Sequence, residues 1–300
     1  MNNLIRCLSE DGTVLVMAAD TTELVETARQ YHETSKVCSA ALGRLLTAAS
    51  LMGTLLKSDD YSLTLRINGG GPAGSVIAVG DPHGNVRGYV MNSHIELPLN
   101  EKGKLDVGGA VGKDGHLTVI KDIGMRDPYI GQIPIVSGEI AEDVTSYYAI
   151  SEQVPTVCAL GVLVNPDLSI AAAGGFMIQL LPTADDTIID RVEAGLQGLP
   201  SVTEMLTQGM SPLDICKKVV PNFEIGVLDE EHPEYVCNCS KERVEAALLS
   251  TGRESLLEMA EDAGTQVRCH FCPKIYSFTP DELRKLAEGS VDDDEDDEEE

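Results

Sequence analysis

Two pairs of closely spaced cysteines are the residues of this sequence best suited to chemistry. The first pair is Cys237 and Cys239, separated by one residue, and the second is Cys269 and Cys272, separated by two. Zinc in structural sites takes four ligands arranged as a tetrahedron, and two tight turns that each supply two thiolates provide such a set. We therefore predict that these four cysteines bind one Zn²⁺ ion.

Other arrangements of the cysteines are less favoured. Free cysteine is often buried, so four unrelated buried thiols are one alternative, but random placement seldom gives two close pairs that bracket a short helical segment. A secreted disulfide framework is disfavoured because no signal peptide opens the sequence, and eight cysteines without a targeting segment predict a reducing compartment, the cytoplasm. His270 is a further ligand candidate, but four thiolates already complete a tetrahedron, so we expect it beside the ligands or in solvent.

The charge of the chain excludes one class of partner. Its 300 residues include 22 basic and 49 acidic side chains, which gives a net charge of −27. A surface this negative repels phosphate backbones and argues against nucleic acid as a partner. The most apolar stretch, residues 40–56, is interrupted by polar side chains and is too short to span a bilayer, so we expect no membrane partner.

The elements that precede the cysteines predict an α+β fold. Residues 3–19 read as two strands, and residues 39–57 form the best helix of the first half, with apolar residues at helical spacing and one face buried against a sheet. Short alternating runs cut by glycine turns follow, and the turn at residues 113–115 is expected to form a hairpin. Helix and strand segments do not alternate regularly, so we predict a β-rich core domain with packed helices over residues 1–182.

Two details of this core are predicted more specifically. Residues 139–152 read as a helix, and the two strands that follow pair across residues 165–167. Gly174 and Gly175 lie inside the second of these strands, which indicates a bulge or a close approach of two backbones.

The strand pattern stops at Pro182, and short helices replace it. They are separated by glycine and proline, and helices this short gain most of their stability from packing. We expect residues 183–232 to be a metastable helical linker that folds by docking on the core or on the cysteine module. Residues 233–290 form the small zinc-binding, redox-switch domain, and residues 291–300 form an acidic tail that should be disordered.

Zinc would supply much of the stability of a module this small. A chain of about sixty residues is near the lower limit for an unaided hydrophobic core, and zinc contributes on the order of 10–16 kcal/mol in small structural sites. Four thiolates around Zn²⁺ carry a net charge of −2, which neighbouring basic side chains can offset. These are Lys241, Arg243, Arg268 and Lys274.

Three functions compete for the cysteine module. A permanent structural zinc site explains the ligands but not the C-x-C spacing, whose two sulfurs can close into a small-ring disulfide once the metal leaves. A thiol oxidoreductase would use Cys269 and Cys272, but such pairs usually start a helix, and this pair precedes a hairpin-like segment. The third is an oxidation switch, for which zinc-bound thiolates are suited because they are already the reactive form.

Several motifs together give the chain a resemblance that covers residues 1 to about 288. It resembles the redox-regulated holdase chaperone family of bacteria, the thirty-three-kilodalton heat-shock protein. Besides both cysteine pairs, the matching segments are SAALGR at 39–44, GGGPAG at 69–74, GKLDV at 103–107, SEQVP at 151–155, GVLVNP at 161–166 and AGGF at 173–176.

The resemblance implies a mechanism. In that family the reduced, zinc-bound form is an inactive monomer, and oxidation forms disulfides that here would be Cys237–Cys239 and Cys269–Cys272. Zinc is released, the linker unfolds, and a homodimer holds unfolding client proteins without ATP; no catalytic residue or enzyme activity is implied. This chain departs from the family in its long acidic tail and in four further cysteines, of which Cys216 in the linker could form off-pathway disulfides. The other three of these cysteines are Cys7, Cys38 and Cys158.

The working hypothesis is therefore an oxidation-activated, ATP-independent holdase of the cytoplasm. The alternative is a constitutive zinc-stabilised protein-interaction module without redox switching.

Overall fold

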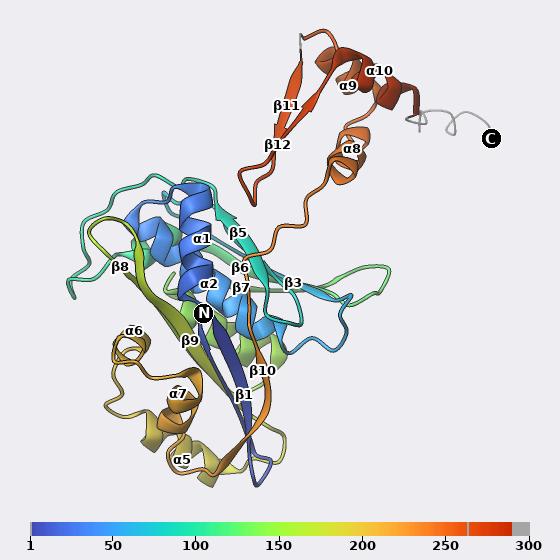
Figure 1. The fold of residues 1–300 in the computed structure, drawn as a ribbon. Helices are drawn as coiled ribbons and strands as arrows, with labels where there is room; N and C mark the ends of the chain where they lie inside the picture. The colour runs from blue at the N-terminus through green and yellow to red at the C-terminus, as the bar shows by residue number, and fades with distance from the viewer. Residues whose placement is uncertain (1, 263, 290–300) are drawn as a thin grey trace. The chain divides into compact units, whose positions relative to one another are not determined.

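The computed structural model describes residues 2–262 and 264–289 and has a mixed α and β composition (Figure 1). The chain divides into two compact units, Met1–Val236 and Cys237–Glu300. The acidic tail expected at residues 291–300 lies outside the described residues. Among the helices that are described, none is long and apolar enough to cross a membrane.

The first unit contains two five-stranded antiparallel sheets. The first sheet has the strand order β10-β1-β2-β9-β8, and the second has the order β5-β4-β3-β6-β7. In the first sheet the strands are β1 Asn3–Ser9, β2 Val14–Asp20, β8 Thr156–Val164, β9 Ile170–Leu180 and β10 Ile225–Glu231. In the second they are β3 Ser62–Gly70, β4 Val76–Gly80, β5 Val86–Val90, β6 Gly112–Asp122 and β7 Tyr129–Pro134.

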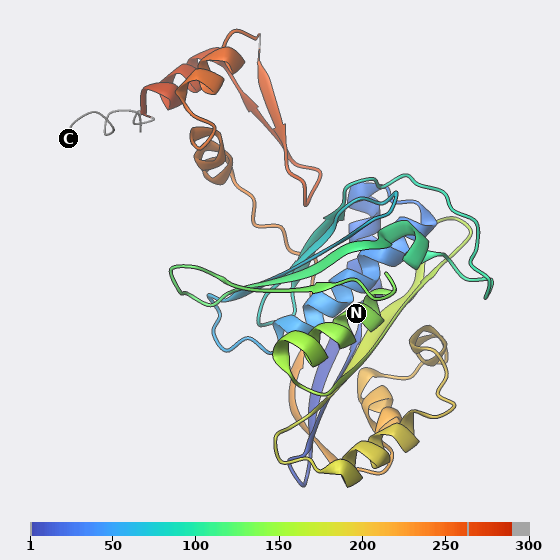
Figure 2. The same ribbon diagram turned by 180° about the vertical axis from the view of Figure 1, so that it is seen from behind.

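Helix α2 (Lys36–Gly53) lies between the two sheets and is the centre of the main core (Figure 2). The sequence predicts this helix three residues later and with one buried face, whereas every residue from Val37 to Gly53 is buried except Arg44. Its side chains pack against β4 and β5 on one side and against β8 and β9 on the other. A helix that is apolar on nearly all sides is stable only when it is enclosed, and two sheets enclose it here.

Four shorter segments complete the core around α2. They are α1 (Thr22–His32), α3 (Val107–Val111), α4 (Ile140–Tyr147) and the π-helical turn Tyr148–Glu152. The helix expected at residues 139–152 is therefore α4 followed by a wider turn. The sequence analysis did not identify α3, because its glycines read as a loop; the signal was Asp106, whose carboxylate accepts a hydrogen bond from the Gly109 N–H at 2.9 Å.

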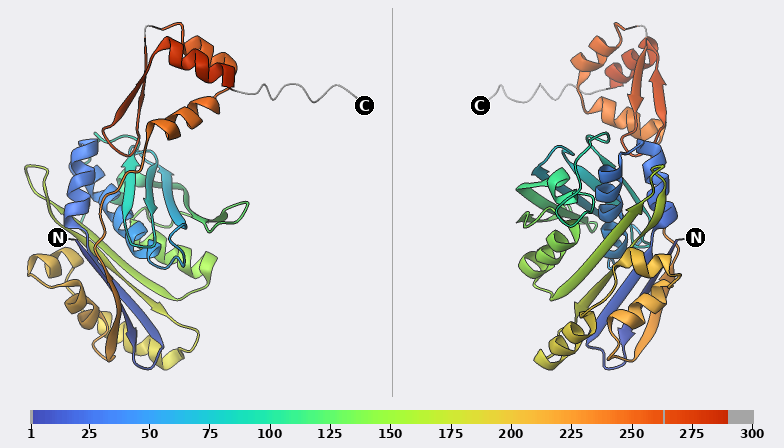
Figure 3. Two further views of the ribbon diagram at one scale, coloured as in Figure 1. Left: turned by 45° about the vertical axis from the view of Figure 1, so that its right-hand side comes forward. Right: turned by 90° about the vertical axis from the view of Figure 1, so that its left-hand side faces the viewer.

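Three helices cover the outer face of the first sheet (Figure 3). They are α5 (Asp186–Leu196), α6 (Val202–Thr207) and α7 (Pro212–Val219). Side chains of β1 and β2 alternate between the two faces, so Leu4 and Met17 join the core around α2, whereas Ile5 and Val16 join the cluster under α5, α6 and α7. The first sheet thus separates two hydrophobic clusters.

The segment after α7 returns to the first sheet as an extended chain. Strand β10 pairs with β1 at the sheet edge, and the residues that follow are tied to β5. The Tyr235 hydroxyl donates to the Gly88 carbonyl at 2.8 Å and lies 3.2 Å from Nε2 of His32, and the Val236 N–H donates to the Val86 carbonyl at 2.8 Å. The last residue of the first unit is therefore fixed to its core.

The two glycines in β9 allow close backbone approach and no bulge. The pairing of β2 with β9 is continuous through Gly174 and Gly175. A Cβ atom at Gly174 would lie 2.3 Å from the Ala19 carbonyl oxygen, and one at Gly175 would lie 2.8 Å from the Ala159 carbonyl oxygen. Of the two structures that the sequence indicated here, close approach is the correct one.

The hairpin turn predicted at residues 113–115 is wrong. These residues belong to β6, which pairs with β3 and directly follows α3. Strand β6 begins at Gly112, whose φ of +82° suits glycine, and the register between β3 and β6 shifts there. Gly115 then comes so close to β3 that a Cβ atom would lie 2.0 Å from the Asn68 carbonyl oxygen. The glycine therefore marks a bulge inside a strand.

The second unit is small. It consists of α8 (Lys241–Leu249), α9 (Arg253–Met259), the hairpin β11 (Thr265–Arg268) and β12 (Ile275–Phe278), and α10 (Pro280–Gly289). Its core contains six buried side chains among the described residues, Leu248, Leu256, Ala260, Phe278, Leu283 and Ala287. So few buried apolar groups stabilise a fold only weakly.

Candidate metal centre

Two non-helical segments present the four cysteines predicted to bind metal. Cys237 and Cys239 lie in the extended chain before α8, which begins after Ser240. Cys269 and Cys272 lie in the loop that joins β11 to β12, and the Cys269 N–H donates to the Lys274 carbonyl at 3.0 Å, which closes that loop.

The four sulfur atoms converge on one point. All of them lie within 4.8 Å of one another, with Sγ to Sγ distances of 3.7 Å for Cys237 and Cys269 and 3.5 Å for Cys239 and Cys272. A tetrahedron of sulfurs around zinc, each about 2.3 Å from the metal, has edges of roughly 3.8 Å. The spacing and the all-sulfur donor set therefore fit a tetrahedral, thiophilic ion such as Zn²⁺.

Hydrogen bonds support the sulfur atoms. The Tyr276 hydroxyl donates to Sγ of Cys239 at 3.1 Å, and the Phe271 N–H donates to Sγ of Cys269 at 3.4 Å. Burial raises the pKa of the Cys239 thiol, but the Tyr276 hydrogen bond and the neighbouring thiols outweigh it and lower that pKa to about 7. Burial raises the pKa of Cys272 to about 12. A bound metal would have to displace the proton from Cys272, whereas Cys239 is already close to ionisation.

Tyr276 is the functional residue that sequence reasoning missed. The sequence places it in the predicted hairpin but gives no sign that its hydroxyl turns toward a cysteine. The available signal was its position four residues after Cys272, on the strand that leaves the cysteine loop. Hydrogen bonds to metal ligands commonly orient the ligand and tune its basicity.

The basic residues and the histidine near the cysteines differ in their exposure and in their partners. Lys241, which was expected to offset thiolate charge, forms an ion pair with Glu282 at 2.5 Å, and its ammonium lies 5.2 Å from the centre of the Phe278 ring. The other three basic residues of that set are exposed. His270 is exposed and is not a member of the convergent cluster, although it lies between two of its cysteines in sequence.

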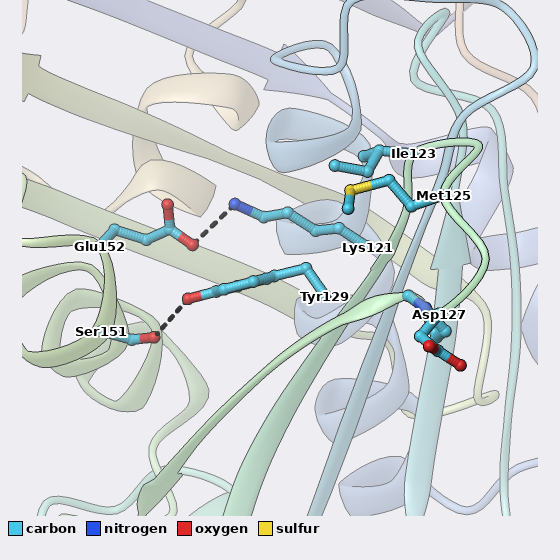
Figure 4. Close-up of a pocket in the computed structure, with 8 residues that line it drawn as sticks. Lys121, Ile123, Met125, Asp127, Tyr129, Ser151 and Glu152 are labelled. Atoms are coloured by element: carbon cyan, nitrogen blue, oxygen red, sulfur yellow. Dashed lines mark hydrogen bonds and ion pairs between the residues drawn. The ribbon is translucent and has the colours of Figure 1, made fainter.

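A second concave region lies on the first unit, beside β7 (Figure 4). This cavity of about 560 Å³ has the exposed side chains of Met125 and Tyr129 at its rim. Two of its charged groups pair with each other, Lys121 with Glu152 at 2.7 Å, and Glu152 also accepts a hydrogen bond from the Tyr147 hydroxyl, while Asp127 is a further acidic residue of the lining. Burial raises the pKa of Tyr147, which keeps that hydroxyl protonated as a donor. These polar groups support local packing.

The family of the chain follows from comparison with known proteins. The sequence profile of the family described as "Hsp33 protein" matches residues 2–279. The chain belongs to the Hsp33 family. A 33 kDa chaperonin of Clostridium perfringens strain 13 is 48% identical over 289 residues, covering 96% of this chain and 91% of that protein. A 33 kDa chaperonin of Clostridium beijerinckii is 46% identical over 290 residues, covering 96% and 99%.

The fold is also that of an Hsp33 protein. The crystal structure of the 33 kDa chaperonin (heat shock protein 33 homolog) from Thermotoga maritima matches with a TM-score of 0.89 and 36% identity, covering 97% of this chain and 99% of that one. The resemblance to this family that the sequence motifs indicated is confirmed. By the names of its relatives, the Hsp33 family is a family of chaperones and not of enzymes.

Proposed function

We propose that this chain is a redox-regulated, ATP-independent holdase of the cytoplasm, inactive while reduced and zinc-bound. The observation that carries the proposal is the convergence of four thiols within 4.8 Å in a unit with a small core. Bound zinc would neutralise thiolate charge and hold the two cysteine segments together. Cys237, Cys239, Cys269 and Cys272 would be its ligands.

The switch rests on the chemistry of those four thiols. Oxidation of two thiols to a disulfide by peroxide forms one S–S bond, breaks the O–O bond and yields two water molecules. The sulfurs of a disulfide are poor metal ligands, so oxidation opens the site and removes its contribution to folding. The pairing Cys237–Cys239 and Cys269–Cys272 is proposed from the family resemblance, since the cluster places each sulfur near all of the others.

The segment 183–232 is proposed as the part that responds. Its helices have 11, 6 and 8 residues, lengths at which an isolated helix is marginal in water. They are held largely by apolar packing on the first sheet, so their release would uncover Phe176, Ile178 and the helices' own apolar faces. Such surfaces bind unfolding proteins and a second copy of the chain by the hydrophobic effect, which is the basis for proposing clients and an oxidised homodimer.

The alternatives are separated by geometry and by one assay. A thiol oxidoreductase is disfavoured because Cys269 and Cys272 follow a strand and do not begin a helix, where the helix dipole would favour a thiolate. The assay compares how the chain suppresses aggregation of an unfolding client before and after peroxide with mild heat. Zinc release and free thiols are counted in the same samples.

The two remaining hypotheses predict different results in that assay. The holdase should become active as zinc leaves and four thiols disappear, and reductant should reverse the change. A Cys38→Ala variant, which removes a buried thiol outside the cluster, should respond like the parent protein. Equal activity in the reduced and oxidised states would support the constitutive zinc-stabilised interaction module in place of the switch.

A further inference from the structure

Residues 232–236, named the strap from here on, form an extra strand at an edge of the second sheet. The strap runs parallel to the start of β5, which is the last strand on its side of that sheet. The Val86 N–H donates to the Glu234 carbonyl at 2.9 Å, and the Val236 N–H donates to the Val86 carbonyl at 2.8 Å. In sequence the strap lies between β10 and the first cysteine of the candidate metal centre.

The side chain of Tyr235 extends this pairing along β5. Its hydroxyl donates to the Gly88 carbonyl at 2.8 Å and accepts a hydrogen bond from the Gly88 N–H at 3.2 Å. Alternate residues of a strand direct their backbone groups to opposite sides, and Val86 and Gly88 direct theirs away from β4 and toward the strap. The strap therefore occupies the outward-facing backbone groups of β5 at both positions.

The ring of Tyr235 lies in a seat formed by helix α1. It meets the Tyr31 ring edge to face, with ring centres 5.3 Å apart, and Nε2 of His32 lies 3.2 Å from its hydroxyl. The seat is partly open to solvent, since the Tyr31 side chain is 40% exposed. It suits an aromatic side chain that has an apolar ring and a polar tip.

We propose that the strap takes the place of a client, and that the edge of β5 binds an extended segment of an unfolded polypeptide once the strap has left. An uncovered edge strand presents unpaired backbone groups that pair readily with another extended chain. The strap shows that polypeptide in this conformation fits the edge. Backbone hydrogen bonds at Val86 and Gly88 would hold segments of any sequence, and the seat on α1 would favour an aromatic residue.

Capture of a client at this edge rests on the proposed function, because the strap must first be released. Toward β10 the strap is held by the Asn2 side chain, which donates to the Pro233 carbonyl at 2.9 Å. Its other end continues into the second unit. When loss of zinc unfolds that unit, Val236 becomes the end of an ordered segment, and such ends open at little cost in free energy. The strap and a client then compete for the same groups of β5.

The proposed site is separate from the surface beneath α5, α6 and α7. That surface belongs to the first sheet and offers apolar side chains, whereas the edge of β5 belongs to the second sheet and offers backbone hydrogen bonds. A probe that depends on backbone donors therefore distinguishes the two.

The test uses the full-length protein, either zinc-loaded and reduced or freed of zinc. Zinc is removed by peroxide in one series and by a chelator under reducing conditions in another. The probe is a heptapeptide of alternating valine and tyrosine with a lysine at each end, whose charge suits this acidic chain. Its control has the same side chains but carries a methyl group on every valine and tyrosine nitrogen, so it cannot donate the bonds of an added strand. Hydrogen exchange of the Val86 and Gly88 amides is followed by NMR.

In the zinc-loaded protein both amides should be protected, and neither peptide should change their exchange. Removal of zinc should speed their exchange by about tenfold or more. The unmethylated peptide should then restore protection, and the methylated peptide should not.

A substitution tests the contact of the strap without removing zinc. Tyr235→Phe keeps the ring and deletes the hydroxyl, so exchange of the Gly88 amide in the zinc-loaded protein should quicken about two- to tenfold. Tyr31→Phe is the matched control, because it deletes a hydroxyl from the neighbouring ring and leaves that of Tyr235 in place. It should exchange as the parent protein does.

Unchanged protection of Val86 and Gly88 after zinc removal would overturn the proposal, since the strap would have stayed. Equal protection by the two peptides would also overturn it. Protection without peptide that rises with protein concentration would identify a second copy of the chain as the occupant, which again overturns it. If chelation opens the strap and peroxide does not, the redox part of the proposed function fails and the site stands. Suppression of client aggregation, measured in the same samples, tests that function separately.

Discussion

The hydroxyl of Tyr276 should strengthen metal binding through Cys239, and Tyr276→Phe removes that hydroxyl alone. Its donor–acceptor distance of 3.1 Å is short for a bond to sulfur, and the acceptor is a thiolate when metal is bound. Hydrogen bonds to charged groups contribute about 1.5–3 kcal/mol, and the lower value applies because Tyr276 is partly exposed and water can replace the hydroxyl. About 1.4 kcal/mol corresponds to a tenfold weaker zinc affinity.

The measurement is competition for Zn²⁺ with a chelator of known affinity, at constant pH and under reducing conditions. Ser277→Ala is the matched control, because Ser277 is the next residue of β12 and is exposed. The control should bind zinc as the parent does, and circular dichroism of the zinc-bound forms should be identical for all three proteins. If Tyr276→Phe bound zinc as tightly as Ser277→Ala, the hydrogen bond would not contribute to the site and the reasoning would be wrong.

Three further substitutions test other parts of the structure. Cys239→Ser should lose most bound zinc, and proteolysis should then cut the second unit and the α5 to α7 segment faster than in the parent protein. If the α5 to α7 segment were cut at the same rate as in the parent, its proposed coupling to zinc binding would be contradicted. Gly174→Ala should lower the free energy of unfolding by about 3 kcal/mol, because the new Cβ meets a backbone oxygen that cannot rotate away, and urea denaturation would measure it. The Arg29 side chain lowers the pKa of Glu26 from 4.5 to about 2, so Glu26 stabilises the fold above pH 4.5 and that stabilisation is lost as the pH falls through about 2. Glu26→Gln should therefore lower the free energy of unfolding at neutral pH and make it fall less steeply as the pH is lowered. Urea denaturation midpoints of variant and parent across that pH range measure this, and an equal fall in both proteins would contradict the prediction.

The sequence predicted the elements whose signals are local. Cysteine spacing identified the four residues that the structure brings together, because metal ligands from two tight turns leave a pattern in the chain itself. Helical spacing of apolar residues predicted α2, and the end of the strand pattern at Pro182 predicted the short helices that the structure shows as α5, α6 and α7. Gly174 and Gly175 marked a close approach, although glycine alone could not distinguish it from a bulge.

The features that the sequence did not reveal depend on contacts between distant segments. The position of α2 between two sheets could not be read from its own residues, since a helix buried on one side and one buried on two sides are both apolar. The 113–115 segment was mistaken for a turn because aspartate and glycine are typical of turns, whereas in the structure it is the bulged part of β6, where the register with β3 shifts. The contact of Tyr276 with Cys239 likewise joins residues with no shared local pattern.

The enclosure of α2 has a consequence for how the first unit can open. Removing either sheet would expose this helix to water, so the sheets and α2 should melt as a single cooperative block and exchange their amide hydrogens at the slowest rates in the chain. The layer formed by α5, α6 and α7 packs on a separate hydrophobic cluster, on the opposite face of the first sheet from α2. If the α5 to α7 segment is released on oxidation as proposed, the two sheets and α2 would not have to refold when it returns.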